Sequence, residues 1–481
     1  MGTVLAVLVG VVMLGIVAGM HWYVWRRLVR DSTATGSLGR RLGTGVIVFG
    51  GLSLGAMLAT RIGDVPFALV RVVSTVGFLW AAVLIYLLLG VLVGEVVRPL
   101  LARLPFRSKD GRATSTARDL AAVGDSAESK GAARAPSDRE TPALTTGSAS
   151  SATDTPERAH AGTATTERTS SESRTAGTAP ASNETVAVTP ASPATEQAET
   201  TTQPTPLSRR VFVSRALAGV TAVAAVATVG GGTYGVLKGP AVNYVTVPLR
   251  RLPADATGFR ITLVSDLHLG PVLGRDFTRT VVDAVNGTRP DLIAIAGDLV
   301  DASVADLRDA TAPLADLRAP HGVFFGMGNH EYYSGPDEWI EYLPSLGMRV
   351  LLNSRVSLAS FDIAGVDDVE GEAYGRGPDM AATLRGRDTT RPCVLLAHQP
   401  VLVHDAVDHG VDLQLSGHTH GGQLFPGNLL AGLANPTVAG LERYGDTQLY
   451  VTRGAGAWGP PTRVAAPSDI TVLELVPDTS V

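Results

Sequence analysis

Five short groups of Asp, His and Asn residues in the C-terminal half of the chain carry side chains that commonly bind divalent metals. These groups are Asp266-Leu267-His268, Gly297-Asp298, Gly328-Asn329-His330-Glu331, His398-Gln399-Pro400 and Gly417-His418-Thr419-His420. Carboxylates, a carboxamide and imidazoles without a thiolate suit borderline or hard divalent ions, and Mn, Fe and Zn are the leading candidates. The chain contains one cysteine, Cys393, which excludes a zinc site built on several thiolates.

Two divalent ions held about 3.5–4 Å apart would allow hydrolysis of a phosphate ester, because they supply a nucleophile at neutral pH and neutralise charge on the phosphoryl oxygens. Asp298 has two oxygens and can bridge both ions, while Asn329 can ligate through its carbonyl without adding charge. His330 follows Asn329 directly, and adjacent side chains diverge, so His330 is free to protonate the leaving oxygen as a general acid. Asp301 or Glu331 could orient His330 and hold it protonated, and Asp301 is the preferred candidate.

Each of the five groups follows a short apolar run that is typical of a buried strand. These runs are residues 261–265, 292–296, 323–327, 393–397 and 413–416. Helical patterns separate the runs near residues 278–285, 304–317, 337–346 and 401–407, and a final strand is expected at 470–475. The alternation predicts an α/β domain, in which ligand sites form at the carboxyl ends of strands. We therefore expect the five groups to converge on one site, with glycines before Asp298, Asn329 and His418 allowing close backbone approach.

The ordered series D-x-H, G-D, G-N-H-E, H and G-H-x-H resembles the calcineurin-like metallophosphoesterase superfamily over residues 261–423. The resemblance implies a two-sheet sandwich flanked by helices, with a dinuclear metal centre at the sheet edge. It assigns the first metal to Asp266, His268, Asp298 and His420. It assigns the second metal to Asp298, Asn329, His398 and His418. Together with the membrane segments, the Gly421-Gly422-Gln423 ending is similar to a membrane-anchored branch that includes cell-envelope phosphodiesterases and lipid-linked pyrophosphate hydrolases.

The first hundred residues contain three uncharged apolar runs, at 3–25, 42–60 and 72–94. Each run is close to the ~20 residues that an α-helix needs to cross a bilayer. We interpret residues 1–100 as three transmembrane helices, because an uncharged start followed by two further runs does not match a cleaved signal peptide. Arginines cluster between the first two runs and after the third, which predicts that both stretches are cytoplasmic and that the N-terminus faces out.

Residues 107–207 contain no aromatic residue and no isoleucine, so we expect a disordered cytoplasmic linker over 101–207. A fourth apolar segment lies within 208–240, preceded by the sequence S-R-R-V-F-V-S at 208–214. This sequence resembles the twin-arginine export signal except at its last two positions. An ordinary fourth transmembrane helix is the alternative, and both interpretations place the catalytic domain, residues 246–481, on the extracytoplasmic side of the cell membrane.

Three remaining features have mainly structural interpretations. From Thr246 onward there are 17 Arg and no Lys against 29 Asp and Glu residues, so nucleic acid is not an expected partner. The acidic sequence at 367–372 matches no ligand loop and favours a solvated turn. Trp458 and Arg463 belong to a Gly/Pro-rich segment, for which a purely structural loop is favoured over substrate contact.

These features predict a membrane-anchored, two-metal phosphoric ester hydrolase of the phosphodiesterase or pyrophosphatase type. A phosphorylated substrate linked to lipid or to the cell envelope is favoured, because the membrane tether raises the local concentration at the bilayer. The alternatives are a nucleotide phosphodiesterase and a metal-bound sensor or scaffold without activity. The complete ligand set and the presence of His330 argue against an inactive protein.

Overall fold

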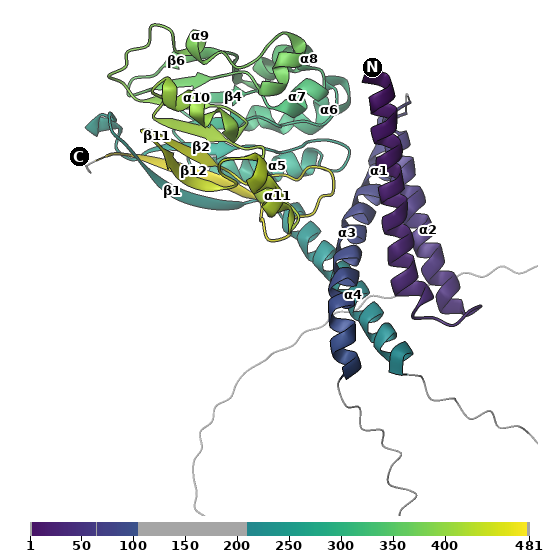
Figure 1. The fold of residues 1–481 in the computed structure, drawn as a ribbon. Helices are drawn as coiled ribbons and strands as arrows, with labels where there is room; N and C mark the ends of the chain where they lie inside the picture. The colour runs from purple at the N-terminus through teal and green to yellow at the C-terminus, as the bar shows by residue number, and fades with distance from the viewer. Residues whose placement is uncertain (1, 64, 104–208, 479–481) are drawn as a thin grey trace, which may run out of the picture. The chain divides into compact units, whose positions relative to one another are not determined.

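The computed structural model describes residues 2–63, 65–103 and 209–478 (Figure 1). The linker expected over 101–207 lies outside this range except for residues 101–103, which belong to a helix. Four described helices are long and apolar enough to cross a membrane. They are α1 (Gly2–Val24), which continues into a π-helical turn at Trp25–Arg30, α2 (Leu38–Ala59), α3 (Phe67–Arg103) and α4 (Arg209–Leu237). At 37 residues α3 spans about 55 Å, which exceeds a bilayer core of about 30 Å. The apolar run at 72–94 therefore marked only the middle of this helix.

Small residues allow these helices to pack closely. Gly50 of α2 faces the ring of Trp80 in α3, where an added Cβ would lie 1.9 Å from Trp80 Cε2. Gly90 of α3 faces Thr221 of α4, where an added Cβ would lie 2.6 Å from Thr221 Cγ2. Close backbone approach at small residues is a common way for membrane helices to associate, since lipid provides little hydrophobic driving force between them.

The C-terminal part of the chain forms two six-stranded sheets. The first contains, in spatial order, β1 (Ala241–Leu249), β12 (Asp469–Pro477), β2 (Phe259–Val264), β3 (Leu292–Ala296), β4 (Val323–Gly326) and β5 (Met348–Leu351). The second contains β10 (Gly440–Tyr444), β11 (Thr447–Val451), β9 (Leu413–Ser416), β8 (Cys393–Leu396), β7 (Asp362–Gly365) and β6 (Ser354–Ser357). One buried apolar cluster joins residues of both sheets, including Leu263 and Leu396. The expected two-sheet α/β sandwich is confirmed.

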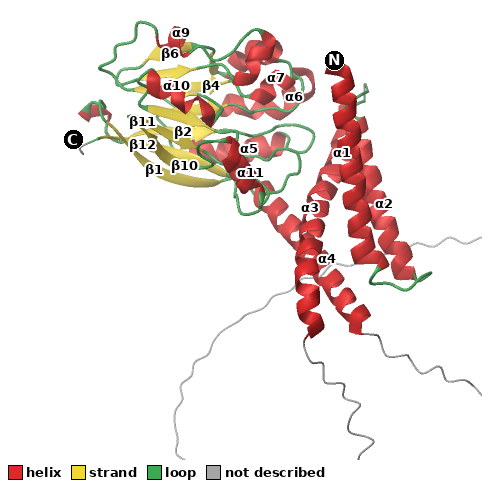
Figure 2. Ribbon diagram, viewed as in Figure 1, coloured by secondary structure: helices red, strands yellow, loops and turns green. Residues whose placement is uncertain are grey.

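Helices cover the outer faces of the sheets (Figure 2). They are α5 (Arg275–Gly287), α6 (Val304–Thr311), α7 (Asn329–Tyr333), α8 (Pro336–Tyr342), α9 (Met380–Leu384) and α10 (Val403–Asp408). A further helix, α11 (Gly427–Ala434), has no buried residue and contacts the turn at His420–Gly422. The helix expected at 304–317 ends its α-helical part at Thr311 and continues as a 3₁₀ turn containing Pro313. Proline lacks the N–H that an α-helix interior needs, and Pro344 accompanies the same change after α8.

The strand pairing positions the five polar groups. In the first sheet β2, β3 and β4 are parallel, and Val264 pairs with Ile295, which pairs with Phe325. In the second sheet β8 and β9 are parallel, and Leu396 pairs with Leu415. The residues that follow these five strands therefore leave the sheets at carboxyl ends, where loops can bring distant side chains together.

Candidate metal centre

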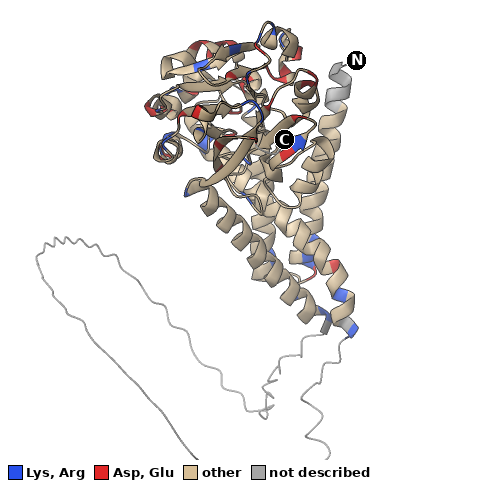
Figure 3. Ribbon diagram, turned by 90° about the vertical axis from the view of Figure 1, so that its left-hand side faces the viewer, with Lys and Arg blue, Asp and Glu red and all other residues tan. Residues whose placement is uncertain are grey.

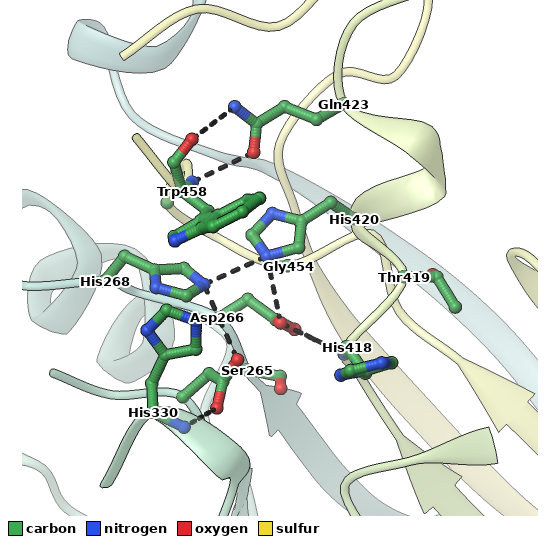
Figure 4. A network of polar contacts seen from close by, with 12 residues as sticks. Ser265, Asp266, His268, His330, His418, Thr419, His420, Gln423, Gly454 and Trp458 are labelled. Carbon is green, nitrogen blue, oxygen red and sulfur yellow. Dashed lines mark hydrogen bonds and ion pairs between the residues drawn. The ribbon is translucent and has the colours of Figure 1, made fainter. Parts of the chain in front are cut away.

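The five groups do meet at one place. Figure 4 shows part of this place, with Asp266, His268, His330, His418 and His420 close together. Ligand atoms of Asp266, His268, Asp298 and His420 lie within 4.8 Å of one another. Ligand atoms of Asp298, His398 and His418 form a second such group, so Asp298 belongs to both. This arrangement is compatible with a dimetal site.

The first group directs three side chains at a common point. His268 Nε2 lies 2.9 Å from His420 Nε2, which in turn lies 3.3 Å from Asp266 Oδ1. His268 Nδ1 donates to Asp301 Oδ1 at 2.8 Å, so the Nε2 lone pair is left facing the centre. Two imidazole nitrogens and a buried carboxylate facing one another suit a cation between them, and the donor set therefore fits a metal ion.

The second group contains a buried polar atom that a metal would satisfy. His398 Nδ1 donates to the carbonyl oxygen of Ala296 at 2.6 Å, which directs Nε2 into the site. This Nε2 makes no hydrogen bond within the part of the chain described, and it lies 3.2 Å from Asp298 Oδ2. His418 Nδ1 and Asn329 Oδ1 lie 3.1 Å apart beside it. These four residues are the ones that the family resemblance assigns to the second metal.

The charges of the site are strongly coupled. Burial opposes ionisation of Asp298, but the imidazoles of His398 and His268 hold its pKa well below the usual range. Burial alone would lower the pKa of His268, whereas Asp301 and Asp298 raise it to about 9. Burial, reinforced by His268, holds the pKa of His420 well below its usual value. Imidazoles bind metal ions in their neutral form, so binding of an ion by His268, whose pKa is raised, would release a proton.

Asp301 lies between a metal-site histidine and the predicted general acid. Its Oδ1 accepts from His268 Nδ1 at 2.8 Å and from His330 Nδ1 at 2.7 Å. Burial opposes ionisation of Asp301, but the two imidazoles lower its pKa to about 2, so this carboxylate is ionised at neutral pH. The backbone N–H of His330 also donates to Asp298 Oδ1 at 2.9 Å. The His330 ring is thus held beside the centre by Asp301.

Glu331, the alternative partner for His330, has a different role. Its carboxylate accepts from the backbone N–H groups of Gly328, Asp298 and Leu299 at 2.8, 3.0 and 2.7 Å. Burial and the nearby Asp298 raise the pKa of Glu331 to about 7. Glu331 therefore ties together two of the loops that present ligands, while Asp301 contacts the His330 side chain.

Five of the candidate ligands adopt an unusual backbone conformation. Positive φ angles between 47° and 71° occur at Asp266, His268, Asp298, His418 and His420. The left-handed region costs roughly 1–2 kcal/mol for a residue with a Cβ, and such conformations cluster at functional sites. The tight turns also need close packing, since an added Cβ at Gly417 would lie 2.3 Å from Asp266 Oδ2 and one at Gly328 2.3 Å from Asp298 Oδ1.

The acidic sequence at 367–372 corrects one expectation. Asp367 and Asp368 are 3% and 0% exposed, so the solvated turn was wrong for these two residues. Asp367 Oδ1 accepts from the hydroxyl of Tyr332 at 2.5 Å, and Asp368 Oδ1 accepts from Gln399 Nε2 at 2.9 Å. Gln399 follows His398, so this pair supports the loop of a metal-site residue. Their position two and three residues after the end of the short strand β7 was the available sequence signal.

Arg463 and Trp458 belong to the same Gly/Pro-rich segment but have different roles. Arg463 is 6% exposed and donates to the carbonyl oxygens of His420 at 2.9 Å and Gly456 at 2.6 Å. Arg463 therefore holds the loop that carries His420 in place. Burial lowers the pKa of the Arg463 guanidinium to about 10. Trp458 is 59% exposed, and its ring centroid lies 5.9 Å from that of His330. Gln423 binds both backbone groups of Trp458, at 2.8 and 2.9 Å, which holds this indole at the rim of the site (Figure 4).

Known proteins resemble this chain over the region that contains the five metal-binding groups. Residues 259–422 match the family model for the calcineurin-like phosphoesterase domain. An uncharacterized metallophosphoesterase of Aquifex aeolicus is 36% identical over 239 residues, which cover 49% of this chain and 91% of that protein. The uncharacterized metallophosphoesterase YkuE of Bacillus subtilis is 32% identical over 286 residues, which cover 56% of this chain and 98% of that protein.

Membrane proteins occur among the relatives. A transmembrane protein with a metallophosphoesterase domain from Danio rerio is 40% identical over 258 residues, which cover 51% of this chain and 59% of that protein. The match thus spans about three-fifths of that relative, and 66% of an uncharacterized metallophosphoesterase from Helicobacter pylori. The match to a solved dimetal phosphatase from Danio rerio covers 41% of this chain and 88% of that chain, with 15% identity and a TM-score of 0.31.

Proposed function

Because this chain belongs to the calcineurin-like metallophosphoesterases and carries four candidate membrane-spanning helices, we propose that it hydrolyses a phosphodiester or pyrophosphate bond in a lipid-linked or cell-envelope substrate. The observation that carries this proposal is the double role of Asp298, which faces both groups of ligands. The hydrogen bond between His330 and Asp301 beside these groups supports turnover rather than a purely structural metal site.

Each part of the site has a role in this hydrolysis. When bound, two divalent ions supply a nucleophile from water and neutralise charge on the phosphoryl oxygens. Asp266, His268, Asp298 and His420 would hold one ion, and Asp298, Asn329, His398 and His418 the other. His330 would donate a proton to the leaving oxygen, and the ionised Asp301 would orient that ring through its hydrogen bond with Nδ1. Mn, Fe and Zn suit this set of ligands, and they are the ions that we propose.

Substrate profiling of the full chain in lipid nanodiscs tests the proposed function. With added Mn²⁺ we expect turnover of the activated diester bis-p-nitrophenyl phosphate, and a higher kcat/KM for a phosphodiester or pyrophosphate attached to a lipid in the same bilayer. Chelation should abolish both activities, and metal addition should restore them. Preference for a soluble nucleotide would replace the lipid-linked proposal. Absence of turnover with Mn²⁺, Fe²⁺ and Zn²⁺ would instead indicate a sensor or scaffold.

The distribution of arginine supports an orientation in the membrane. Arginines lie just after α1 (Arg27 and Arg30), near the end of α3 (Arg98) and at the start of α4 (Arg210 and Arg215). Figure 3 shows basic residues gathered at the ends of the helices that point away from the sheets. The positive-inside rule assigns these ends to the cytoplasm. We therefore propose that the catalytic domain is extracytoplasmic and that the linker is cytoplasmic.

Protease accessibility in spheroplasts provides the measurement for this orientation. Protease added to intact spheroplasts should cleave the catalytic domain and leave an epitope inserted near residue 150 untouched. Cleavage of the epitope alone before lysis would show that the orientation is reversed. A chain with both Arg209→Lys and Arg210→Lys distinguishes the two modes of insertion, because only export by the twin-arginine route should fail in it.

A further inference from the structure

An uncharged surface segment follows the last metal-binding group. Residues 421–441 contain no Asp, Glu, Lys, Arg or His. The segment includes α11, in which no residue is buried. Leu429, Leu430 and Leu433 of this helix are 64%, 71% and 85% exposed, and Phe425 before it is 51% exposed. Contiguous exposed apolar surface of this kind marks a site of interaction with a protein or a membrane.

This segment is joined to the rim of the metal site. Gln423 binds the backbone of Trp458, and the backbone N–H of Phe425 donates to the carbonyl oxygen of Val464 at 3.1 Å. The loop around Trp458, residues 454–462, is also free of charged side chains. We call the large apolar residues that are exposed in these two loops the apolar rim, and they are Phe425, Leu429, Leu430, Leu433 and Trp458.

The same two loops contact helices that can cross the membrane. The hydroxyl of Tyr86 in α3 donates to the carbonyl oxygen of Phe425 at 3.1 Å. Thr462, at the end of the second loop, is hydrogen-bonded at 2.7 Å to Thr233 of α4. The apolar rim is therefore joined to α3 and α4, which are both candidate membrane-spanning helices, and this connection favours a bilayer over a soluble partner as its occupant.

We propose that the apolar rim inserts into the membrane interface and presents the metal site to phosphate groups at the level of the lipid headgroups. Short apolar helices and tryptophan side chains are suited to this depth, because each joins an apolar body to a polar boundary. The inference rests on the proposed hydrolase function and narrows its substrate to a phosphate carried by a lipid of the same bilayer. The rim would act in positioning, while the metal site performs the reaction.

A single probe on α11 tests the docking itself. Cys393 is fully buried, so Leu433→Cys in the full chain gives one accessible thiol for an environment-sensitive fluorophore. In nanodiscs containing phosphatidylglycerol and phosphatidylcholine with brominated acyl chains, the probe should be quenched and its emission shifted to the blue. Ala381→Cys on α9 is the matched control, since it is also exposed, and it should show neither change. Equal emission from both positions would overturn the proposal, and so would cross-linking of Leu433→Cys between two copies without quenching.

A double substitution, Leu430→Gln with Leu433→Gln, tests the consequence for substrate. Both leucines are exposed, so the fold should be unaffected, and the loss of two apolar side chains should raise the apparent KM for a lipid-embedded phosphodiester about tenfold or more. Hydrolysis of bis-p-nitrophenyl phosphate should stay unchanged, as it should in a control chain with Ala381→Gln. An equal fall in the rate of hydrolysis of both substrates, or no change in the rate or the apparent KM for either, would overturn the rim's role. Absence of hydrolysis in the unsubstituted chain would contradict the proposed function. The quenching measurement would still show whether the apolar rim inserts into the membrane.

Discussion

Replacement of Asp298 by alanine should release both metal ions and reduce hydrolysis by about 10⁴-fold or more. One oxygen of this carboxylate, Oδ2, lies 3.7 Å from His268 Nε2 and 3.2 Å from His398 Nε2, so it faces both groups of ligands. Each bound ion contributes several kcal/mol to stabilising the transition state, and every 1.36 kcal/mol corresponds to a tenfold change in rate. Metal content per chain and the rate on bis-p-nitrophenyl phosphate are the two measurements.

Asp309→Ala is a suitable control for the Asp298 substitution. The Asp309 side chain is 82% exposed and pairs with Arg275 on the surface, so its removal should leave two ions bound and the rate unchanged. A tightly held single ion in the Asp298→Ala chain would contradict the bridging role. In that case the shared carboxylate would serve only one of the two groups.

Replacement of His330 by alanine should keep both ions and yet slow the hydrolysis of an ester with a poor leaving group by about 10²–10⁴-fold, the usual contribution of a positioned proton donor. His330 contacts Asp301 through Nδ1, and its ring lies outside the two ligand groups that share Asp298. An activated ester has a leaving group that needs little protonation, so its hydrolysis should slow far less. The measurement compares the two esters in the same protein at equal metal content.

His398→Ala distinguishes proton donation from metal binding. Loss of this side chain removes a ligand of the second ion, so both esters should be hydrolysed more slowly to a similar extent. If His330→Ala also loses an ion, or slows both esters equally, His330 would be a ligand or a phosphate-binding residue. The role of general acid would then be unfilled.

The strands that carry the site could be predicted from the sequence because they are buried on both faces. The runs at 292–296 and 413–416 coincide with β3 and β9, in which every residue is buried. Strands β10 and β6 have no fully buried residue, so their sequences carry no apolar pattern that separates them from loops. The pairing of β1 with β12 joins segments more than 220 residues apart, a contact that no local pattern encodes.

The chemistry of the site was likewise predicted only in part. Residue types and their positions after strands identified the groups that converge. The sharing of Asp301 between His268 and His330 depends on the tertiary fold, because those histidines are 62 residues apart in the chain. The buried pair Asp367 and Asp368 was missed for a related reason, since polar residues in a short acidic sequence resemble a solvated turn until the surrounding loops are in place.

The connection between α4 and β1 keeps the first sheet close to a candidate membrane-spanning helix. Only Lys238, Gly239 and Pro240 separate the end of the helix from a strand that pairs over nine residues with β12. Three residues reach at most about 11 Å, so the sheet begins almost at the end of the membrane helix. A site held this close to the bilayer would therefore meet molecules in the bilayer more often than molecules in bulk solution. For a lipid substrate, the rate should follow its mole fraction in the membrane: dilution with inert lipid slows turnover, whereas more solvent around the same vesicles does not.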